Sequence, residues 1–175
     1  VAFARICGIE EDTLDSWVRL EDAASTVAAV AAASATAPAA IGSLIVPREG
    51  ADDVHALGAI AMVSSRPELL SRVLVWARAG SGMHGVRIFK RRRGSAAEGL
   101  VSCWHTVVVD DRLPSLPGSR QLACSANASP REGPVAVVLK ALAKPHGGFG
   151  LREGGTVGEV LEELTGGASD TERLA

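Results

Sequence analysis

The length, composition and charge of the chain limit what it can be. With 175 residues, of which 47% are hydrophobic, it is long enough for one domain with a substantial core. Its net charge of −2 gives it no general attraction to nucleic acid or to an anionic membrane surface. Cys7, Cys103 and Cys124 are too few and too scattered for a disulfide framework, so we expect a reducing, cytoplasmic compartment.

The first segment, residues 1–46, is rich in alanine. The sequence from Val1 lacks the basic region followed by an apolar core that is typical of a signal peptide, so no secretory signal is predicted. The uncharged stretch 23–41 is nearly long enough to span a bilayer, but its Ala, Ser, Thr and Pro content favours an alanine-rich helix or a low-complexity linker. We expect a variable segment that is partly disordered or helical.

Apolar spacing predicts two helices between residues 57 and 74. The first helix has one face formed by Leu57, Ile60, Ala61 and Ser64. Ser65 and Glu68 have the spacing of a capping box, and Pro67 suits the first turn, so a second helix is predicted to begin there. Its expected buried side consists of Leu69, Leu70, Val73 and Leu74.

A β-hairpin is predicted after these helices. The glycine-rich residues 78–85 indicate a loop that leads into a strand at 86–89, and residues 90–98 connect it to a second strand at 101–109. Asp110 and Asp111 end that strand, because aspartate is poor in strands but bonds nearby backbone amides in turns, here before Pro114. Two adjacent carboxylates also suggest a catalytic or metal-binding pair.

Two further helices are predicted near the end of the chain. Pro134 suits a first turn, and the following apolar stripe is Val135, Val138, Leu139 and Leu142. Thr156 and Glu159 form a second capping box, and Gly166 can end that helix. Its stripe is Val157, Val160, Leu161 and Leu164.

Four segments in order carry a family resemblance: GVRIFK at 85–90, WHTVVVDDRLP at 104–114, VLKALAKPHGGF at 138–149 and LTGG at 164–167. Together they resemble the protease core of the calpain family of cysteine peptidases, most closely over residues 67–167. The resemblance implies an α+β fold, the cysteine-bearing first lobe of a papain-like core, with mainly helices around a small antiparallel sheet. We place this lobe at residues 47–167, followed by a tail at 168–175. A structure that lacks this arrangement of helices and sheet would indicate that the resemblance is misleading and that the chain is an unrelated binding domain.

The resemblance also implies where catalytic residues belong. In the family, a cysteine at the start of a buried helix becomes a thiolate beside a histidine, which an asparagine orients. Histidine and asparagine belong to a second lobe that follows the LTGG block, and only eight residues follow Gly167 here. We therefore expect the second lobe to be missing from this chain. Within this pattern Asp110 and Asp111 belong to a scaffold turn rather than to the catalytic triad.

The family's cysteine helix begins Q-G-x-L-G-D-C-W-F-L, and this chain departs from that text. Without a gap, Val54 takes the place of the cysteine and Arg48 that of the glutamine. With a gap, Ala56-Leu57-Gly58 matches x-L-G and the D-C-W-F-L segment is deleted, an alignment favoured by its three identities. Both alignments vacate the nucleophile position around Val54 to Gly58, so no catalytic residue is assigned.

Two functions remain open. The first is a non-catalytic, pseudopeptidase module for protein interaction or regulation within a longer chain. The alternative is a truncated or mis-assembled fragment of an active calcium-dependent cysteine endopeptidase. Protein partners or a polypeptide substrate are expected, with no nucleic acid and no membrane span.

The resemblance implies a calcium site in this lobe. Asp53 matches the aspartate that precedes the family's cysteine motif, and Glu132 matches the glutamate of its E-F-W block. Carboxylates are suitable hard ligands for calcium. A cap on the helix that begins near Pro134 is the favoured alternative role for Glu132.

Three smaller patterns have simpler explanations. Cys103 and His105 share one side of a strand, which suits a Cys/His dyad or half a metal site, although packing and edge positions are the favoured interpretation. The basic run at 90–93 suits nucleic acid, but a solvated hairpin tip is favoured because no aromatic residue interrupts it. Gly154 and Gly155 before Thr156 lack the lysine of a phosphate-binding loop, and a helix cap explains them.

Overall fold

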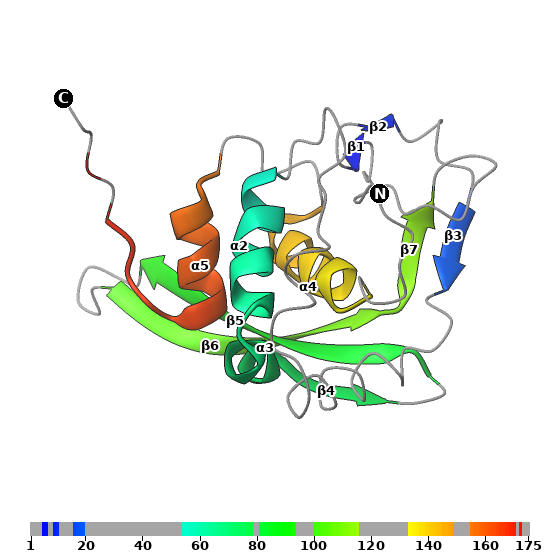
Figure 1. Cartoon of the computed structure of the whole chain (residues 1–175), viewed down its shortest axis with the longest axis horizontal. Helices are drawn as coiled ribbons and strands as arrows, with labels where there is room; N and C mark the ends of the chain where they lie inside the picture. The colour runs from blue at the N-terminus through cyan, green and yellow to red at the C-terminus, as the bar shows by residue number, and fades with distance from the viewer. Residues whose placement is uncertain are drawn as a thin grey trace.

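A three-stranded antiparallel sheet with helices packed on one face forms the centre of the computed structural model (Figure 1). The structure describes residues 5–6, 9–10, 16–19, 54–78, 81–93, 100–115, 133–148, 155–170 and 172. The helices are α2 (Val54–Ser64), α3 (Pro67–Val73), α4 (Gly133–Ala143), the 3₁₀ helix η4 (Lys144–His146) and α5 (Val157–Thr165). This is the α+β architecture that the sequence predicts.

The strand order of the sheet is β4 (Leu74–Arg78), β5 (Met83–Arg93) and β6 (Leu100–Asp110). Strands β5 and β6 form the predicted antiparallel hairpin, with Met83 opposite Asp110 at one end and Arg93 opposite Leu100 at the other. Each of these two strands has 11 residues, so the hairpin is longer and its connection shorter than expected. The basic run at 90–93 belongs to β5 and not to the tip.

Alternation along β5 and β6 gives the sheet two different faces. Val86 and Ile88 are fully buried against the helices, as is Val109 on the paired strand. The opposite face carries Trp76 and Trp104, which are 38% and 39% exposed. The sheet therefore packs on one side and presents aromatic side chains on the other.

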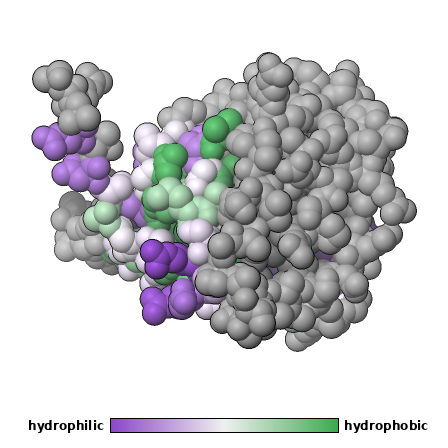
Figure 2. All heavy atoms as spheres, in the orientation of Figure 1, coloured by the Kyte–Doolittle hydropathy of each residue, from purple (hydrophilic) through white to green (hydrophobic). Residues whose placement is uncertain are grey.

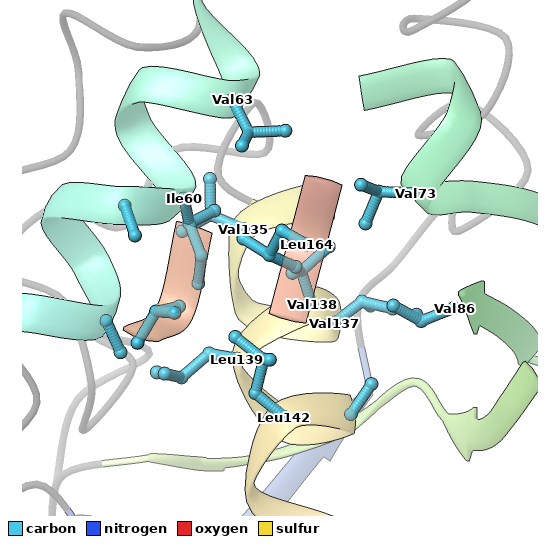
Figure 3. Close-up of a cluster of buried hydrophobic side chains, with 14 of the residues drawn as sticks. Ile60, Val63, Val73, Val86, Val135, Val137, Val138, Leu139, Leu142 and Leu164 are labelled. Atoms are coloured by element: carbon cyan, nitrogen blue, oxygen red, sulfur yellow. The ribbon is translucent and has the colours of Figure 1, made fainter. Parts of the chain in front are cut away.

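The core lies between this sheet and helices α2, α4 and α5 (Figure 3). The predicted stripe of α4 is buried, and so are the other apolar residues in its second half, so this helix is enclosed on all sides. Besides the two valines and the isoleucine of the sheet, the largest contributors to the core are Leu57, Ile60, Leu70, Val73, Val137, Leu139, Leu142, Val160 and Leu164.

Local capping signals define α5. The Thr156 side chain accepts a hydrogen bond from the Glu159 amide at 3.2 Å, and the Glu159 carboxylate accepts one from the Thr156 amide at 2.8 Å. Gly166 ends the helix with a left-handed φ of 72°. Both ends of this helix are as predicted from sequence, although Val157 in its apolar stripe is 38% exposed.

The predicted capping box at residues 65–68 is wrong. The N-cap of α3 is Arg66, which makes no side-chain capping hydrogen bond, although Pro67 does occupy the first turn. Ser65 instead completes the end of α2, since its amide bonds to Ala61 O at 2.9 Å and its hydroxyl donates to Met62 O at 2.7 Å. Because the two helices follow each other so closely, Ser65 is used by the first helix and cannot cap the second.

Strand β4 was not predicted. Leu74 was assigned to the apolar side of the preceding helix, and it is buried, but it is the first residue of this strand. The strand exists through its pairing with β5, from Leu74 opposite Val86 to Arg78 opposite Met83. The pairing of β4 with β5 cannot be predicted from the spacing of apolar residues within β4 alone.

Three short strands lie in the alanine-rich segment 1–46. Strand β3 (Ser16–Arg19) pairs antiparallel with β7 (Arg112–Ser115), which directly follows the Asp110–Asp111 turn. Strands β1 (Arg5–Ile6) and β2 (Ile9–Glu10) pair with each other. Residues 23–41 lie outside the described residues, and in the described portion of the chain no helix is long and apolar enough to cross a membrane.

Candidate functional site

The sequence resemblance predicts the family's nucleophile position at the start of α2. The helix begins at Val54 and runs without interruption to Ser64, and it contains no cysteine. A helix N-terminus carries partial positive charge and stabilises a thiolate there. Val54 offers an aliphatic side chain that cannot ionise, and that side chain is 50% exposed.

Helices α2 and α5 lie side by side with their N-terminal ends at the same end of the molecule (Figure 1). A Cβ on Gly155 would lie 2.7 Å from His55 Nε2, and a Cβ on Gly58 would lie 3.9 Å from Val157. His55 Nε2 is buried and has no hydrogen-bond partner among the residues that the structure describes. The glycine before the α5 cap is thus explained by close packing on His55, as well as by the cap.

Apolar side chains remain exposed on this pair of helices. Val54 and Met62 on α2 are 50% and 56% exposed, and Val157 on α5 is 38% exposed. Figure 2 shows hydrophobic surface on this face beside the more polar outer residues. Val54 and Val157 lie at the N-terminal ends of the two helices, whereas Met62 lies near the C-terminal end of α2.

The two adjacent aspartates take different structural roles. Asp110 Oδ1 accepts hydrogen bonds from the Arg112 amide at 2.9 Å and from Lys140 Nζ at 2.5 Å. Burial alone would raise the pKa of Asp110, but these two hydrogen bonds and the positive charges of Lys140 and Arg112 outweigh it, so its pKa is lowered. Asp111 is buried, and a Cβ on Gly82 would overlap its carboxylate. Asp110 therefore holds the turn between β6 and β7 and joins it to α4.

The lysines of α4 and η4 complete the anchorage of this turn. Lys140 Nζ also donates to Arg112 O at 2.6 Å, and Lys144 Nζ donates to Val108 O at 2.7 Å. A pocket of about 660 Å³ adjoins them, with Met83, Val109 and Ala143 on its apolar side. Lys140 is thus bound to the turn and Lys144 to the strand before it, so Asp110 has the scaffold role that the family resemblance implies.

Most of the described basic run is used for packing. Lys90 Nζ lies 2.8 Å from His146 Nε2 and 2.7 Å from Glu163 Oε1, and Arg91 NH1 lies 3.3 Å from Glu162 Oε2. The favoured interpretation of a hairpin tip is therefore wrong for Lys90 and Arg91, which belong to β5 and pair with α5, although the Arg91 side chain is 39% exposed to solvent. Sequence reasoning missed this network because its members are as many as 73 residues apart and no local pattern links them.

The side chains of Cys103 and His105 meet on β6. As two residues apart on a strand, they point to the same side, and Cys103 Sγ lies 3.0 Å from His105 Nε2. Both residues are exposed, and β6 is an edge strand of its sheet. Their position on an edge strand is as expected, whereas the expected packing role is wrong because both side chains are exposed.

The two residues assigned to calcium, Asp53 and Glu132, lie outside the described residues. Within the described ranges, no three His, Cys, Asp or Glu side chains come together as a metal site. Calcium binding by Asp53 and Glu132 therefore stays a prediction.

Comparison with known proteins identifies the family of the chain. A family model described as calpain family cysteine protease matches residues 17–174, which begin within β3 and include the three-stranded sheet and helices α2 to α5. Relatives include "Calpain clp-4" of Caenorhabditis elegans, 46% identical over 67 residues, which are 38% of this chain and 9% of that protein. "Calpain" of Schistosoma mansoni is 30% identical over 115 residues, 66% of this chain and 14% of that protein.

"Calpain-9" of Homo sapiens is 32% identical over 120 residues, which are 68% of this chain and 16% of the human protein. The aligned part of the chain thus spans at most about a sixth of these three relatives. The family model covers most of the chain, and the sheet, the aspartate turn and the four helices follow the arrangement that the resemblance implies. The chain belongs to the calpain family of cysteine proteases.

Proposed function

We propose that this chain is a non-catalytic module of the calpain family that acts by protein interaction or regulation within a longer protein. The observation that carries the proposal is the start of α2, where Val54 is the first residue of the helix and no cysteine follows in it. Without a nucleophilic thiolate, a papain-like triad retains at best the residual catalysis of substrate binding and the oxyanion hole.

The helix start at Val54 supports the ungapped alignment. In that alignment Val54 replaces the cysteine, so the residue that would carry the thiol is the first residue of the helix, as the family pattern requires. This differs from the gapped alignment favoured from sequence identities. Under either alignment the proposal of an inactive lobe is the same.

The described surface suits an interaction role. Val54 and Val157 are apolar and exposed at the N-terminal ends of α2 and α5, and Met62 is exposed farther along α2. Exposed apolar side chains on neighbouring helices support a contact with another protein or domain. We infer protein partners and a cytoplasmic location for the module.

The alternative function is a truncated or mis-assembled fragment of an active calcium-dependent cysteine endopeptidase. Its support is the family membership together with the short share of each relative that the chain covers. Sequencing the transcript across the codons for Val54 to Gly58 distinguishes the two, because an intact D-C-W-F-L segment there would establish the alternative.

The activity itself is tested on the full-length parent protein. Cleavage of casein is measured with and without calcium, and with and without a thiol-directed inhibitor. We expect no inhibitor-sensitive turnover, and turnover that calcium starts and the inhibitor stops would overturn the proposal. A Val54→Cys variant of the same protein is the matched control, because the ungapped alignment predicts that its new thiol is alkylated at the helix start.

A further inference from the structure

Cys103 and His105 form a nucleophile and base pair outside the region where the family has its catalytic cysteine. The distance of 3.0 Å between Cys103 Sγ and His105 Nε2 is short enough for a hydrogen bond between thiol and imidazole. Both side chains are exposed, so a reagent in solvent can reach the sulfur. A thiol becomes a strong nucleophile when an adjacent imidazole accepts its proton.

The sheet fixes the geometry of this pair. Cys103 lies opposite Lys90, and His105 lies opposite Ile88, on the same face of the hairpin. Lys90 is held in place by Glu163 and His146 at 2.7 Å and 2.8 Å. The imidazole is therefore carried by a regular, well-paired strand and not by a loop.

A second observation is a small pocket beside the imidazole. It has a volume of about 290 Å³ and is lined by Ile88, Lys90, His105, Thr106, Val107 and Pro145. Its walls come from both strands of the hairpin and from η4. The recess adjoins the imidazole of His105, whose Nε2 lies 3.0 Å from Cys103 Sγ, and Cys103 itself is not among the residues that line it.

We propose that Cys103, with His105 as its base, is a site of reversible mixed-disulfide formation with low-molecular-weight disulfides. His105 Nε2 takes the proton from Cys103 Sγ, and the sulfur attacks one sulfur of the small disulfide. A new S–S bond forms to Cys103 as the S–S bond of the reagent breaks, and the departing thiolate takes up the proton from the imidazolium. The reagent supplies the oxidising equivalent, and one small thiol is released for each Cys103 modified.

This proposal is independent of the proposed function. Cys103 is on β6, whereas the vacated nucleophile position is at the start of α2, and no peptide bond is cleaved in the step. A failed peptidase assay would leave the Cys103 proposal standing, and an unreactive Cys103 would leave the pseudopeptidase proposal standing.

The test uses the full chain and oxidised glutathione as the probe. Peptide mass spectrometry follows modification at Cys103 separately from that at Cys7 and Cys124. Wild type is compared with His105→Gln, which keeps a polar side chain but removes the base, and with Ser102→Ala as a matched control on the same strand. Circular dichroism confirms that the three proteins are folded, and dithiothreitol should reverse the modification.

At pH 7 we expect Cys103 of wild type and of Ser102→Ala to react about tenfold faster than Cys103 of His105→Gln, since that variant lacks the base that accepts the proton of the thiol. Equal rates at pH 7 would overturn the proposal. If His105→Gln does not fold, folded wild type is compared with wild type unfolded in urea, and equal rates at Cys103 in the two states also overturn the proposal.

Discussion

Lys90 on β5 and Glu163 on α5 lie 73 residues apart in the sequence, and Lys90 Nζ donates to Glu163 Oε1 over 2.7 Å. Only 24% and 18% of these two side chains are exposed, so water screens the pair weakly. His146 Nε2 lies 2.8 Å from the same ammonium group and joins η4 to the pair. The Lys90 ammonium thus connects β5 to η4 and α5, two helices that follow it by more than 50 residues in the chain.

Replacing Glu163 by glutamine should weaken this junction. Glu163→Gln keeps the size of the side chain but leaves the Lys90 ammonium without its carboxylate, and we expect the free energy of unfolding to fall by about 1–2 kcal/mol. Urea unfolding followed by circular dichroism measures it. Glu172→Gln, at an exposed residue, is the matched control, and equal losses in the two variants would contradict the role given to the pair.

The buried imidazole of His84 should make stability depend on pH. His84 is 1% exposed, and within the described part of the chain neither ring nitrogen has a hydrogen-bond partner. Burial lowers the pKa of His84 from its usual 6.5, and the charges of Asp111 and Asp110 raise it by less. The folded chain therefore holds the ring neutral at a pH where the unfolded chain binds a proton. The stabilisation is complete above pH 6.5 and is lost as the pH falls from there toward the lowered pKa.

The measurement for His84 is the free energy of unfolding in urea between pH 7.5 and pH 5, in steps of about half a unit. Wild type should lose stability over this window, and His84→Leu should lose less, because leucine cannot titrate. Thr106→Ser, at an exposed position of the same hairpin, should keep the slope of the wild type. Parallel slopes for wild type and His84→Leu would exclude His84 as the cause.

The cap of α5 offers a local test of stability. Thr156→Ala removes the acceptor of the 3.2 Å hydrogen bond from the Glu159 amide and should lower the free energy of unfolding by about 1 kcal/mol. Thr156→Ser keeps a hydroxyl acceptor and should lose only a fraction of that. Chemical denaturation of the three proteins decides it, and an alanine variant as stable as the serine variant would argue against the cap.

Features that depend on neighbouring residues could be predicted from the sequence. The cap at Thr156, the end of the helix at Gly166 and the buried stripe of α4 are as expected, because each involves residues within one or two helical turns. The antiparallel hairpin could also be predicted, since its strands follow one another along the chain. The family resemblance extended these local predictions to the arrangement of the whole lobe.

Features that depend on residues distant in the sequence, or on two elements that compete for one residue, could not be predicted from the sequence. Strand β4 needs β5 beside it, and Lys90 needs Glu163 from the end of the chain. The false capping box at Ser65 arose because two helices compete for one hydroxyl, and only the structure shows that α2 takes it. The Cys103–His105 contact could be foreseen as a shared side of a strand, but not as an exposed pair at 3.0 Å.

Two glycines provide opposite predictions for the same substitution. Gly58 lies inside α2, and a Cβ there would meet nothing closer than Val157 at 3.9 Å. Gly58→Ala should therefore raise the free energy of unfolding by about 0.5–1 kcal/mol, since alanine favours the helix and restricts the unfolded chain.

Gly166 has a φ of 72°, and a Cβ there would lie 2.7 Å from Trp104 Cζ2. Gly166→Ala should therefore cost about 2 kcal/mol, because left-handed backbone is unfavourable for alanine and the indole must shift as well. Thermal and urea unfolding of both variants measure the pair. If the two substitutions change stability in the same direction, either the open space at Gly58 or the close contact between Gly166 and Trp104 is not present in solution.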